Sequence, residues 1–349
     1  MKFIKKSILA LNIVLIIGLL LAYLSPYFDP NDYWIFSMFG LFYPVLLFAN
    51  IAMVLFWMIV EFKYLFASLI TIFMGWSHLQ GFVNFSALSE EPGDLTVMTY
   101  NANFFYSVQN GTKKDVKNKR QEVSSFFASQ KDVDVFCLQE SSKFSKDILK
   151  KLLPDYHVHE MPRRATFIIS RYPIISNGEI DFGTSTNSCI WADIKTQSGK
   201  VRIYTAHLQS NRVSKDAVVV LDNANLQEKK TWNGIRGILS KYSQSSRKRA
   251  KQAQMIADHA AKCAHKTIIA ADVNDPPTSY TYSRLCGDFQ DSFVAAGAGI
   301  GTTYAGRIPM LRIDYIFADN GFVVESFEVL KESYSDHYPV KGVYSFVEE

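Results

Sequence analysis

Six short polar strings that accompany apolar, strand-like runs constrain this chain more than any other feature. They are Met98–Asn103, Val135–Glu140, Tyr204–Leu208, Ile268–Asn274, Arg312–Ile316 and Ser335–Val340. A strand of four to eight apolar residues belongs in a buried sheet, where an ionised carboxylate is costly unless it lies at the strand end and meets a metal ion or a partner. We therefore expect a sheet-based fold whose strand ends deliver these polar side chains to one shared edge.

The polar side chains of these strings form a set rich in oxygen donors and imidazoles. The set consists of Asn101, Glu140, His207, Asp272, Asn274, Asp314, Asp336 and His337. Hard oxygen ligands suit Mg²⁺ or Mn²⁺, and the same set suits a bound phosphate. Each residue alone has an ordinary explanation: Asn101 as a turn cap, Asp314 as the partner of Arg312, or His207 as a hydrogen-bonded core residue. All six strings together favour a metal-dependent site.

In this order, the six strings resemble the endonuclease/exonuclease/phosphatase superfamily, over about Leu95 to Val347. Phe167–Ile174 is similar to the family's strand before a turn, and Asp275–Tyr282 is similar to the loop after its Asp-x-Asn string. Ala271 departs from the pattern, because the family usually has Gly before the Asp. Since Ala is small, we expect a shifted loop and an intact site. The resemblance implies an α/β fold, a four-layer sandwich of two mixed β-sheets flanked by helices.

The resemblance also implies a metal site. Glu140 is the first candidate ligand for Mg²⁺ or Mn²⁺, with Asn101 and Asp336 completing or supporting the shell. Asn103 lies where some relatives carry an acidic metal residue, and it is a candidate substrate-binding residue. The sequence leaves open whether one or two metal ions bind.

Five further residues would carry the catalytic steps that the resemblance implies. His337 is the candidate for imidazole chemistry, and Asp314 would hydrogen-bond it and fix its tautomer. Asp272 would orient or deprotonate the attacking water. Asn274 would hold one phosphate oxygen, and His207 would donate to another. The sequence does not decide whether Asp272 or His337 is the general base.

The chain beyond residue 90 is long enough for one large domain. Its strand-like runs mix direct hairpins with helix-sized gaps, which predicts α/β or α+β layering, and Gly199 marks one hairpin turn. Helices are expected over Lys117–Gln130, Lys143–Leu153 and Ser246–Cys263. Between them lies a long insertion, Gln209–Ser245, whose helical apolar stripe is either a cap packed on the sandwich or a surface that touches lipid.

The first 88 residues contain three apolar runs: Ser7–Leu24, Tyr33–Val60 and Tyr64–Phe85. Each run is close to the ~20 residues that cross a bilayer. A cleaved signal peptide is disfavoured, because no small-x-small site follows the first run before Pro26. We expect three transmembrane helices over residues 1–88, a linker over 89–94 and a catalytic domain over 95–349. The alternative is a two-helix hairpin with an interfacial third helix.

Charged residues around these runs predict an orientation. Three lysines precede the first run, the first loop carries two aspartates without Lys or Arg, and Lys63 lies in the second loop. The positive-inside rule then places the N-terminus in the cytoplasm. With three crossings, the catalytic domain lies outside the cytoplasm, at a plasma or inner membrane.

The charge balance gives slight evidence against a bulk nucleic-acid substrate. The net charge is +4, of which residues 1–89, with four Lys and three acids, contribute little. A strong nucleic-acid binder usually shows a clearer basic excess. One basic run, Arg247–Lys251, has helical apolar neighbours, and we interpret it as a solvated helix face. Four cysteines lack metal-type spacing; Cys137 and Cys189 are expected in the core, although an extracytoplasmic domain would permit a disulfide.

These features predict a membrane-anchored, Mg²⁺-dependent hydrolase of phosphoric ester bonds that attacks a phosphodiester with water. Tethering at a bilayer and the near-neutral domain favour a lipid headgroup ester as substrate. The alternatives are an extracytoplasmic nuclease acting on DNA or RNA and, in a different class, a catalytically silent binding module. The intact motif residues argue against the silent module.

Overall fold

The structure is a computed structural model that describes residues 2–86, 92–141, 143–161, 165–183, 187–211, 229–306 and 310–347. Residues 89–91 of the predicted linker and residues 212–228 of the predicted insertion lie outside these ranges. The chain forms two compact units. The first consists of Met1–Phe82, Ser210–Lys251 and Asp275–Arg284, and the second of Val83–Gln209, Gln252–Asn274 and Leu285–Glu349.

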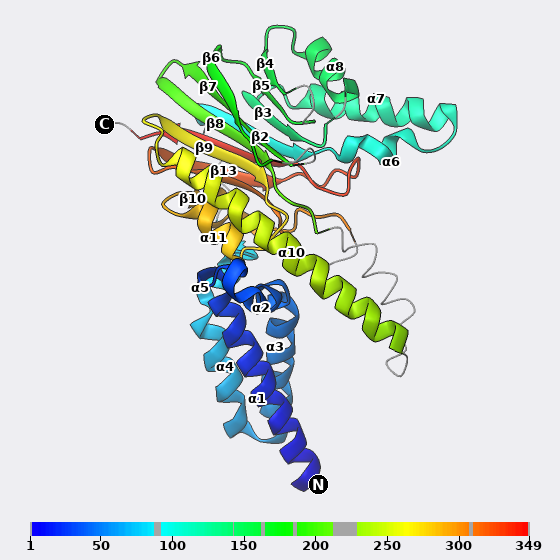
Figure 1. Cartoon of the computed structure of the whole chain (residues 1–349), viewed down its shortest axis with the longest axis vertical. Coiled ribbons are helices and arrows are strands. Elements are labelled where there is room, and N and C mark those ends of the chain that lie inside the picture. The colour runs from blue at the N-terminus through cyan, green and yellow to red at the C-terminus, as the bar shows by residue number, and fades with distance from the viewer. Residues whose placement is uncertain are drawn as a thin grey trace. The chain divides into compact units, whose positions relative to one another are not determined.

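Two six-stranded sheets make up most of the second unit (Figure 1). One has the order β13 (Phe322–Val329), β14 (Val340–Phe346), β2 (Leu95–Asn101), β3 (Val135–Gln139), β5 (Phe167–Ser170) and β4 (His157–Glu160). The other has the order β10 (Gln290–Asp291), β12 (Asp314–Ala318), β9 (Lys266–Asp272), β8 (Gly199–His207), β7 (Ser188–Thr196) and β6 (Ile174–Ile180). Both sheets are mixed, because β2 pairs with β3 and β8 with β9 in parallel while the other neighbours are antiparallel.

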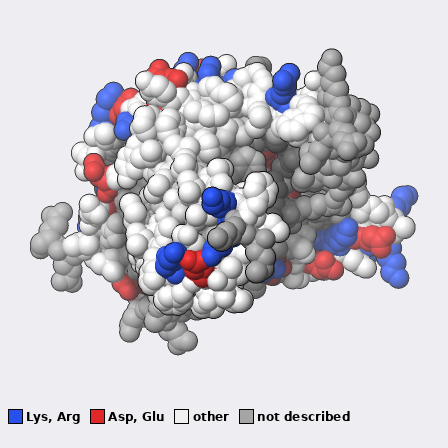
Figure 2. All heavy atoms as spheres, turned by 90° about the horizontal axis from the view of Figure 1, so that it is seen from below, with Lys and Arg blue, Asp and Glu red and all other residues white. Residues whose placement is uncertain are grey.

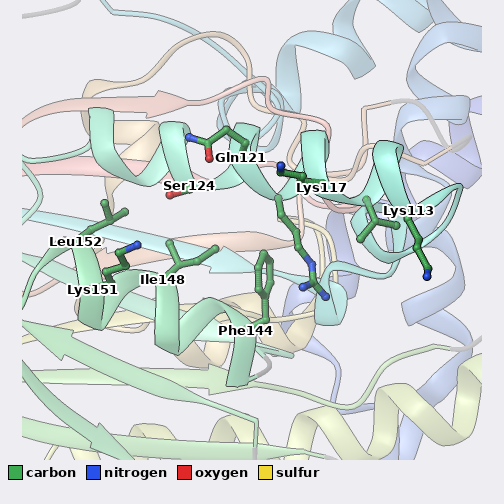
Figure 3. A pocket seen from close by; sticks show the side chains of 10 residues that line it. Lys113, Lys117, Gln121, Ser124, Phe144, Ile148, Lys151 and Leu152 are labelled. Carbon is green, nitrogen blue, oxygen red and sulfur yellow. The ribbon is translucent and has the colours of Figure 1, made fainter.

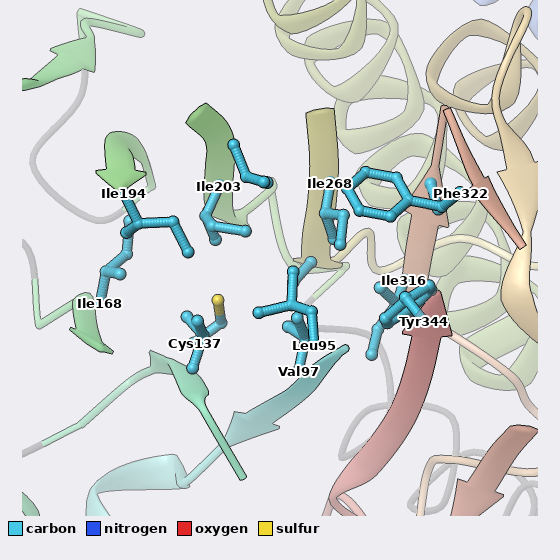
Figure 4. Packing of buried hydrophobic residues seen from close by; sticks show 14 of the residues in the cluster. Leu95, Val97, Cys137, Ile168, Ile194, Ile203, Ile268, Ile316, Phe322 and Tyr344 are labelled. Atoms are coloured by element: carbon cyan, nitrogen blue, oxygen red, sulfur yellow. The ribbon is translucent and has the colours of Figure 1, made fainter. Parts of the chain in front are cut away.

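The main core lies between these two sheets (Figure 4). Leu95, Val97 and Cys137 come from the first sheet, Ile203 and Ile268 from the second, and their side chains point toward one another. All five are fully buried. Burying an aliphatic side chain of this size contributes roughly 1.5–3 kcal/mol, so the alternation of apolar residues along the strands accounts for the face-to-face packing.

Helices cover the outer faces of both sheets. α7 (Lys113–Ser129) and α8 (Lys143–Leu152) pack on the first sheet through a second apolar cluster that includes Phe127 and Phe136. The C-terminal part of α10 (Lys229–Ala260) belongs to the second unit and contacts β8, where the Tyr204 hydroxyl lies 2.7 Å from His259 Nδ1. The predicted four-layer α/β sandwich is confirmed.

Short elements complete the second unit. They are β1 (Val83–Phe85), η3 (Asn103–Phe105), α6 (Tyr106–Gln109), α12 (Ser292–Ala296) and β11 (Ala298–Ile300). β1 pairs with β11, and Asn84 Nδ2 donates to the carbonyls of Phe293 and Val294, both at 2.8 Å. The second unit therefore begins before Leu95. Its first strand, β1, lies at the end of the third apolar run of the sequence.

The first unit is largely helical. Its elements are α1 (Lys2–Leu24), η1 (Ser25–Tyr27), α2 (Pro30–Leu41), α3 (Tyr43–Val60), η2 (Phe62–Tyr64), α4 (Leu65–Met74), α5 (Trp76–Gln80), most of α10 and the start of α11 (Tyr280–Cys286). Among the described residues, Phe3–Tyr27 and Tyr43–Val60 are long and apolar enough to cross a membrane, while the apolar helix Phe62–Met74 is shorter. The second predicted run is divided at Phe42, because Pro44 in the first turn of α3 has no backbone N–H with which to continue the hydrogen bonds of α2.

Several polar side chains lie inside this helical unit, and many large apolar ones are exposed on its surface. Asn12 Nδ2 donates to Ser68 Oγ at 2.6 Å, and Trp57 Nε1 donates to Asn12 Oδ1 at 2.7 Å, all three residues being buried. By contrast, Val45 and Ile59 are 64% and 84% exposed. The face seen in Figure 2 has broad areas without charged side chains. This much exposed apolar surface is unusual for a soluble helix bundle.

The structure differs in part from two local interpretations. α10 is one continuous helix from Lys229, where the sequence predicts a helix beginning at Ser246 and a separate stripe before it. Arg249 is fully buried, so the basic run is not wholly a solvated helix face. No disulfide joins the four cysteines within the described chain.

Candidate functional site

The ends of five strands lie together in the second unit. Asn101 closes β2 opposite Gln139 of the parallel strand β3, and Glu140 follows directly. In the other sheet, His207 at the end of β8 is paired with Asp272 at the end of β9. Asp314 opens β12, which is antiparallel, and it also pairs with Asp272. The carboxyl ends of β2 and β3 in one sheet therefore meet the carboxyl ends of β8 and β9 and the amino end of β12 in the other.

Asp272 is the centre of the contacts between these strand ends. Asn101 Nδ2 donates to Asp272 Oδ2 at 2.7 Å, which joins the two sheets. His207 Nε2 lies 3.7 Å from the same oxygen and 3.4 Å from Glu140 Oε1. Asn274 donates its backbone N–H to Asp272 Oδ1 at 3.0 Å, and its side-chain Nδ2 donates to the carbonyl of Leu208 at 3.2 Å.

His337 and Asp314 form a buried pair beside Asp272. His337 Nδ1 lies 2.9 Å and 3.1 Å from the two carboxylate oxygens of Asp314. This contact assigns the Nδ1 proton to the Asp314 bond and directs Nε2 toward Asp272, whose Oδ2 is 4.0 Å away. The side chains of all three are less than a tenth exposed. The structure thus brings Asp314 and His337 together, the two residues for which the family resemblance implies a hydrogen bond.

Asn103 and Asp336 connect the C-terminal string to β2. Asn103 Nδ2 donates to Asp336 Oδ1 at 2.8 Å, and its backbone N–H donates to Asn101 Oδ1 at 2.9 Å. Thus every one of the nine residues singled out from the sequence contacts another member of the set. Glu140, Asn103, Asn274 and Asp336 are partly exposed and form the accessible side, whereas Asp272, Asp314 and His337 are buried behind them.

The concentration of acids shifts several pKa values. Burial raises the pKa of Glu140, and Asp272 and Asp336 add to this effect while His207 and His337 oppose it. Burial also raises the pKa of Asp272, with His337 opposing and Asp314 adding to the shift. For His337, burial alone would lower the pKa, but the carboxylates of Asp314 and Asp272 outweigh it and the pKa lies above the ordinary value. The site therefore favours added positive charge.

Sequence reasoning missed residues that hold this geometry. Thr303 Oγ1 accepts the backbone N–H groups of Ile313 and Asp314, both at 3.0 Å, and fixes the start of β12. The ring of Tyr304 packs edge-on against His337 at 5.5 Å. The only sequence signal for this pair is the Thr303-Tyr304 dipeptide shortly before the Arg312 string, and it is weak.

Ser335 also supports the site. Its hydroxyl donates to the carbonyl of Asn101 at 2.8 Å and accepts the backbone N–H of His337 at 3.3 Å. Arg312 does not pair with Asp314, as one ordinary explanation of that acid required; it forms a buried bidentate ion pair with Asp291 at 2.9 Å and 2.5 Å. The Asp314 carboxylate therefore pairs with His337 and not with Arg312.

A separate groove of about 540 Å³ lies between α7 and α8 (Figure 3). It is lined by Lys113, Val116, Lys117, Arg120, Gln121, Ser124, Phe144, Ile148, Lys151 and Leu152. None of these ten residues is an acid or a histidine. The groove shares no residue with the cluster at the strand ends.

Comparison with protein-family models identifies the class of this protein. Residues 98–337, more than half of the chain, match the model of the endonuclease/exonuclease/phosphatase family. The chain belongs to this family, whose members hydrolyse phosphoester bonds and typically depend on a divalent metal ion. Residues 5–82 match a domain of unknown function (DUF8431). A comparison with curated protein sequences found no match.

Solved structures share the fold. An endonuclease/exonuclease/phosphatase family protein from Bacteroides thetaiotaomicron is 19% identical with a TM-score of 0.52, covering 74% of this chain and 100% of that one. The mannosyl-6-phosphatase of the same organism is 19% identical with a TM-score of 0.51, covering 72% and 100%. TDP2 from D. rerio, complexed with a single-strand DNA product, is 16% identical with a TM-score of 0.51, covering 72% and 98%. At these identities the similarity establishes the fold alone.

Proposed function

We propose that this protein is a membrane-anchored, divalent-metal-dependent phosphodiesterase that hydrolyses a lipid headgroup ester outside the cytoplasm. The observation that carries the hydrolytic part is the contact network around Asp272, because it joins acids, amides and imidazoles from both sheets. A phosphodiester resists water since its negative oxygens repel a nucleophile. Hydrolysis therefore needs positive charge at the phosphate, an aligned water and a proton donor or acceptor, and this network contains groups for each.

The donor set fits Mg²⁺ or Mn²⁺. Glu140, Asn101 and Asp336 supply hard oxygen atoms, and Glu140 and Asp336 are partly exposed. A second grouping, Asp272, Asp314 and His337, has ligand atoms within 4.8 Å of one another. We favour the first set, because the Nδ1 of His337 and the Asp314 carboxylate already satisfy each other in a hydrogen bond. Burial raises the pKa of Glu140, and a cation held there would favour the ionised carboxylate that coordinates it.

Glu140, with Asn101 and Asp336, would hold the ion, which when bound supplies positive charge to a phosphate oxygen. Asn274 and His207 would donate hydrogen bonds to the phosphate oxygens and orient the phosphorus.

The buried residues would handle the proton. Asp272 lies behind the accessible side and would orient the attacking water. His337, whose Nε2 faces Asp272, would exchange a proton with the water or the leaving oxygen, and Asp314 would stabilise the charged imidazole. Either Asp272 or His337 can serve as the general base in this arrangement.

The helical unit supports the membrane anchor. Two of its helices satisfy the length and hydropathy of a membrane span, and its interior holds hydrogen-bonded polar groups such as Asn12 and Ser68. Polar contacts between helices and apolar outer surfaces are typical of helix packing in lipid. We propose three crossings, with the shorter helix Phe62–Met74 and the residues that follow it forming the third. The distribution of lysines then places the catalytic unit outside the cytoplasm.

A nuclease activity is the second candidate. One structurally similar protein, TDP2 from D. rerio, was solved with a single-strand DNA product, whereas another is a mannosyl-6-phosphatase. The near-neutral charge of the chain beyond residue 89 favours a lipid over a polymer of phosphates.

A substrate panel tests these proposals. The full-length protein, in detergent micelles or nanodiscs with Mg²⁺, would be assayed on phospholipids, sphingomyelin, plasmid DNA, RNA and inositol phosphates, each with and without EDTA. The proposal predicts metal-dependent headgroup release from a lipid. Hydrolysis of nucleic acid without lipid turnover would support the nuclease. Absence of turnover on every substrate, and on bis-p-nitrophenyl phosphate, would support a silent module.

A further inference from the structure

The groove between α7 and α8, here called the α7–α8 groove, lies within the second unit and has an apolar floor. Phe144, Ile148 and Leu152 project from one side of α8 at intervals of four residues. Each is partly buried against the apolar cluster that lies between the two helices and the first sheet. All three also line the groove, so part of each side chain is accessible from it. Eight residues of helix separate Phe144 from Leu152, which makes this floor about 12 Å long.

The rim of the α7–α8 groove is positively charged. It has four exposed cations: Lys113, Lys117 and Arg120 from α7 and Lys151 from α8. The two helices together carry nine Lys or Arg and three acids, and none of these acids lines the groove. Their excess of positive charge is larger than the net charge of the whole chain, which is +4. Positive charge is therefore concentrated on these two helices.

The cations and the apolar residues follow one another along the groove (Figure 3). Lys113 and Lys117 lie toward one end, and Lys151 lies at the other. Phe144 and Ile148 lie between these ends. A ligand whose anionic group lies at the end with Lys113 and Lys117 would therefore lay the rest of its length over apolar side chains.

The size of the groove favours a single extended chain over a whole helix. Its volume of about 540 Å³ is within the range of small-molecule sites. The lining residues of α7 extend from Lys113 to Ser124, a rise of about 16 Å, and dividing the volume by this length gives a cross-section of roughly 33 Å². An α-helix with its side chains is about 10–12 Å across, which needs roughly 80 Å² or more. A polymer of phosphates would leave the apolar floor unused.

We propose that the α7–α8 groove binds an anionic amphiphile, a single apolar chain that ends in a phosphate or carboxylate group. The chain would lie on Phe144, Ile148 and Leu152, and the anionic group would lie near Lys113 and Lys117. Charge complementarity selects the anionic group, because the lining contains cations and no acid. The apolar floor distinguishes this ligand from an inorganic anion. The inference does not rest on the proposed hydrolytic function, since the groove shares no residue with that site.

The experiment uses the full-length protein in nanodiscs of zwitterionic lipid. EDTA is present, so that no metal ion draws the probe to the hydrolytic site. Octylphosphonate is the first probe, because it contains no phosphoester bond. Nonanoate, which has the same apolar chain, is the second probe and distinguishes a carboxylate group from a phosphate group. Binding is measured by equilibrium dialysis, with empty nanodiscs as the control for partition into lipid. Binding of either probe supports the proposal and identifies the preferred anionic group.

A series of chain lengths tests the apolar floor. Fully burying one methylene strengthens binding about fourfold, and an open groove that buries roughly half of each methylene gives about twofold. Octylphosphonate should therefore bind at least about tenfold tighter than butylphosphonate. Octyl glucoside, which has the same chain and a neutral head, should bind at least about tenfold more weakly than octylphosphonate.

Lysine acetylation, measured by mass spectrometry, locates the bound probe. At ten times its Kd octylphosphonate fills about nine-tenths of the sites, and acetylation of Lys113 and Lys117 should slow by up to about tenfold. Lys114 and Lys150 are the matched controls, because they are exposed on the same two helices and do not line the groove. Their acetylation should not change.

Variants of the groove test the charge and the floor separately. The double variant Lys113→Gln/Lys117→Gln should weaken octylphosphonate binding about 20-fold, since one charge pair at about 4 Å in water contributes roughly fivefold. Lys114→Gln is its control and should bind as wild type. Ile148→Ser should reduce the ratio of octylphosphonate to butylphosphonate affinity, with thermal unfolding to check that it is folded. The lysine variants change only exposed side chains, so they test the proposal even where Ile148→Ser does not fold.

Several outcomes would overturn the proposal. Octyl glucoside or inorganic phosphate binding as tightly as octylphosphonate would remove the role of the charge or of the chain. Equal losses in Lys114→Gln and the double variant, or unchanged acetylation of Lys113 and Lys117, would place the probe elsewhere. An acidic amphipathic peptide or an oligonucleotide that protects these lysines, while neither amphiphile binds, would replace the amphiphile with a macromolecular partner.

Discussion

The pair formed by Asp314 and His337 makes a quantitative prediction about catalysis. Asp314→Asn preserves the shape of the side chain but removes the charge that faces His337 Nδ1 at 2.9 Å. At this separation a carboxylate and an imidazolium attract each other by about 6 kcal/mol with an effective dielectric constant of 20. Asp314→Asn also removes part of this attraction from the resting enzyme. Only the part of the attraction that is gained in the transition state affects the rate.

We expect Asp314→Asn to lower kcat/KM by about 10³- to 10⁴-fold, or about 4 to 5.5 kcal/mol, as for other carboxylates that orient a catalytic histidine. His337→Ala should cost at least as much. Because Asp314 acts through His337, the double variant should be little slower than His337→Ala alone.

The assay is kcat/KM on bis-p-nitrophenyl phosphate with saturating Mg²⁺ for the wild type, both single variants and the double variant. Asp319→Asn is the matched control, because Asp319 follows the same strand at its opposite end and accepts backbone N–H groups there. Its kcat/KM should stay near that of wild type. Losses that add in free energy across the cycle would refute the pairing, whatever the natural substrate is.

Three further predictions concern the metal, the membrane and the core. Glu140→Gln should keep the fold, lose most activity and weaken the response to Mg²⁺, and wild-type turnover of this variant would remove Glu140 from the metal site. A reporter that is active only outside the cytoplasm, fused at the C-terminus, should be active, whereas a signal from a cytoplasmic reporter would overturn the three crossings. Arg312→Met should destabilise the protein by about 3–5 kcal/mol in thermal or denaturant unfolding, since it leaves Asp291 buried without its cation. Lys341→Met, which breaks an ion pair with the largely exposed Asp132, should cost about 0–1 kcal/mol, and equal losses in the two variants would contradict this reasoning.

The strands could be predicted from the sequence, because the alternation of apolar residues is a local property of the chain. The run before Asn101, the run before Glu140 and the run before Asp272 each form a buried strand. The hairpin at Gly199 is also confirmed, where φ of +125° requires a glycine. The arrangement of these strands in two sheets was implied by the resemblance to a family, and the periodicity of the sequence did not predict it.

Long-range partners could not be predicted, because a sequence pattern does not state which buried charge meets which. Arg312 and Asp314 are two residues apart, which puts both side chains on one side of an extended strand, yet Arg312 pairs with Asp291 and Asp314 with His337. Arg249 lies in a basic run that is typical of a solvated face, but its partner Asp275 comes from a distant loop. In both cases the deciding contact joins segments that are far apart in the chain.

Backbone strain at the site is the feature furthest from any sequence pattern. Asn103, Phe104, Phe105 and Glu140 all have positive φ, between 42° and 53°. Asn tolerates this region, but for Phe and Glu it costs about 1–2 kcal/mol per residue.

Tertiary contacts hold the strained turn. The backbone N–H of Phe104 donates to the carbonyl of Glu140 at 2.6 Å, so the two strained segments brace each other. Phe105 is fully buried and packs edge-on against Phe127 and Phe144. Apolar packing behind the site thus offsets the free-energy cost of the backbone conformations that direct Glu140 and Asn103 toward the accessible side. The residue types at the strand ends reveal the chemistry, whereas their geometry depends on this packing between elements.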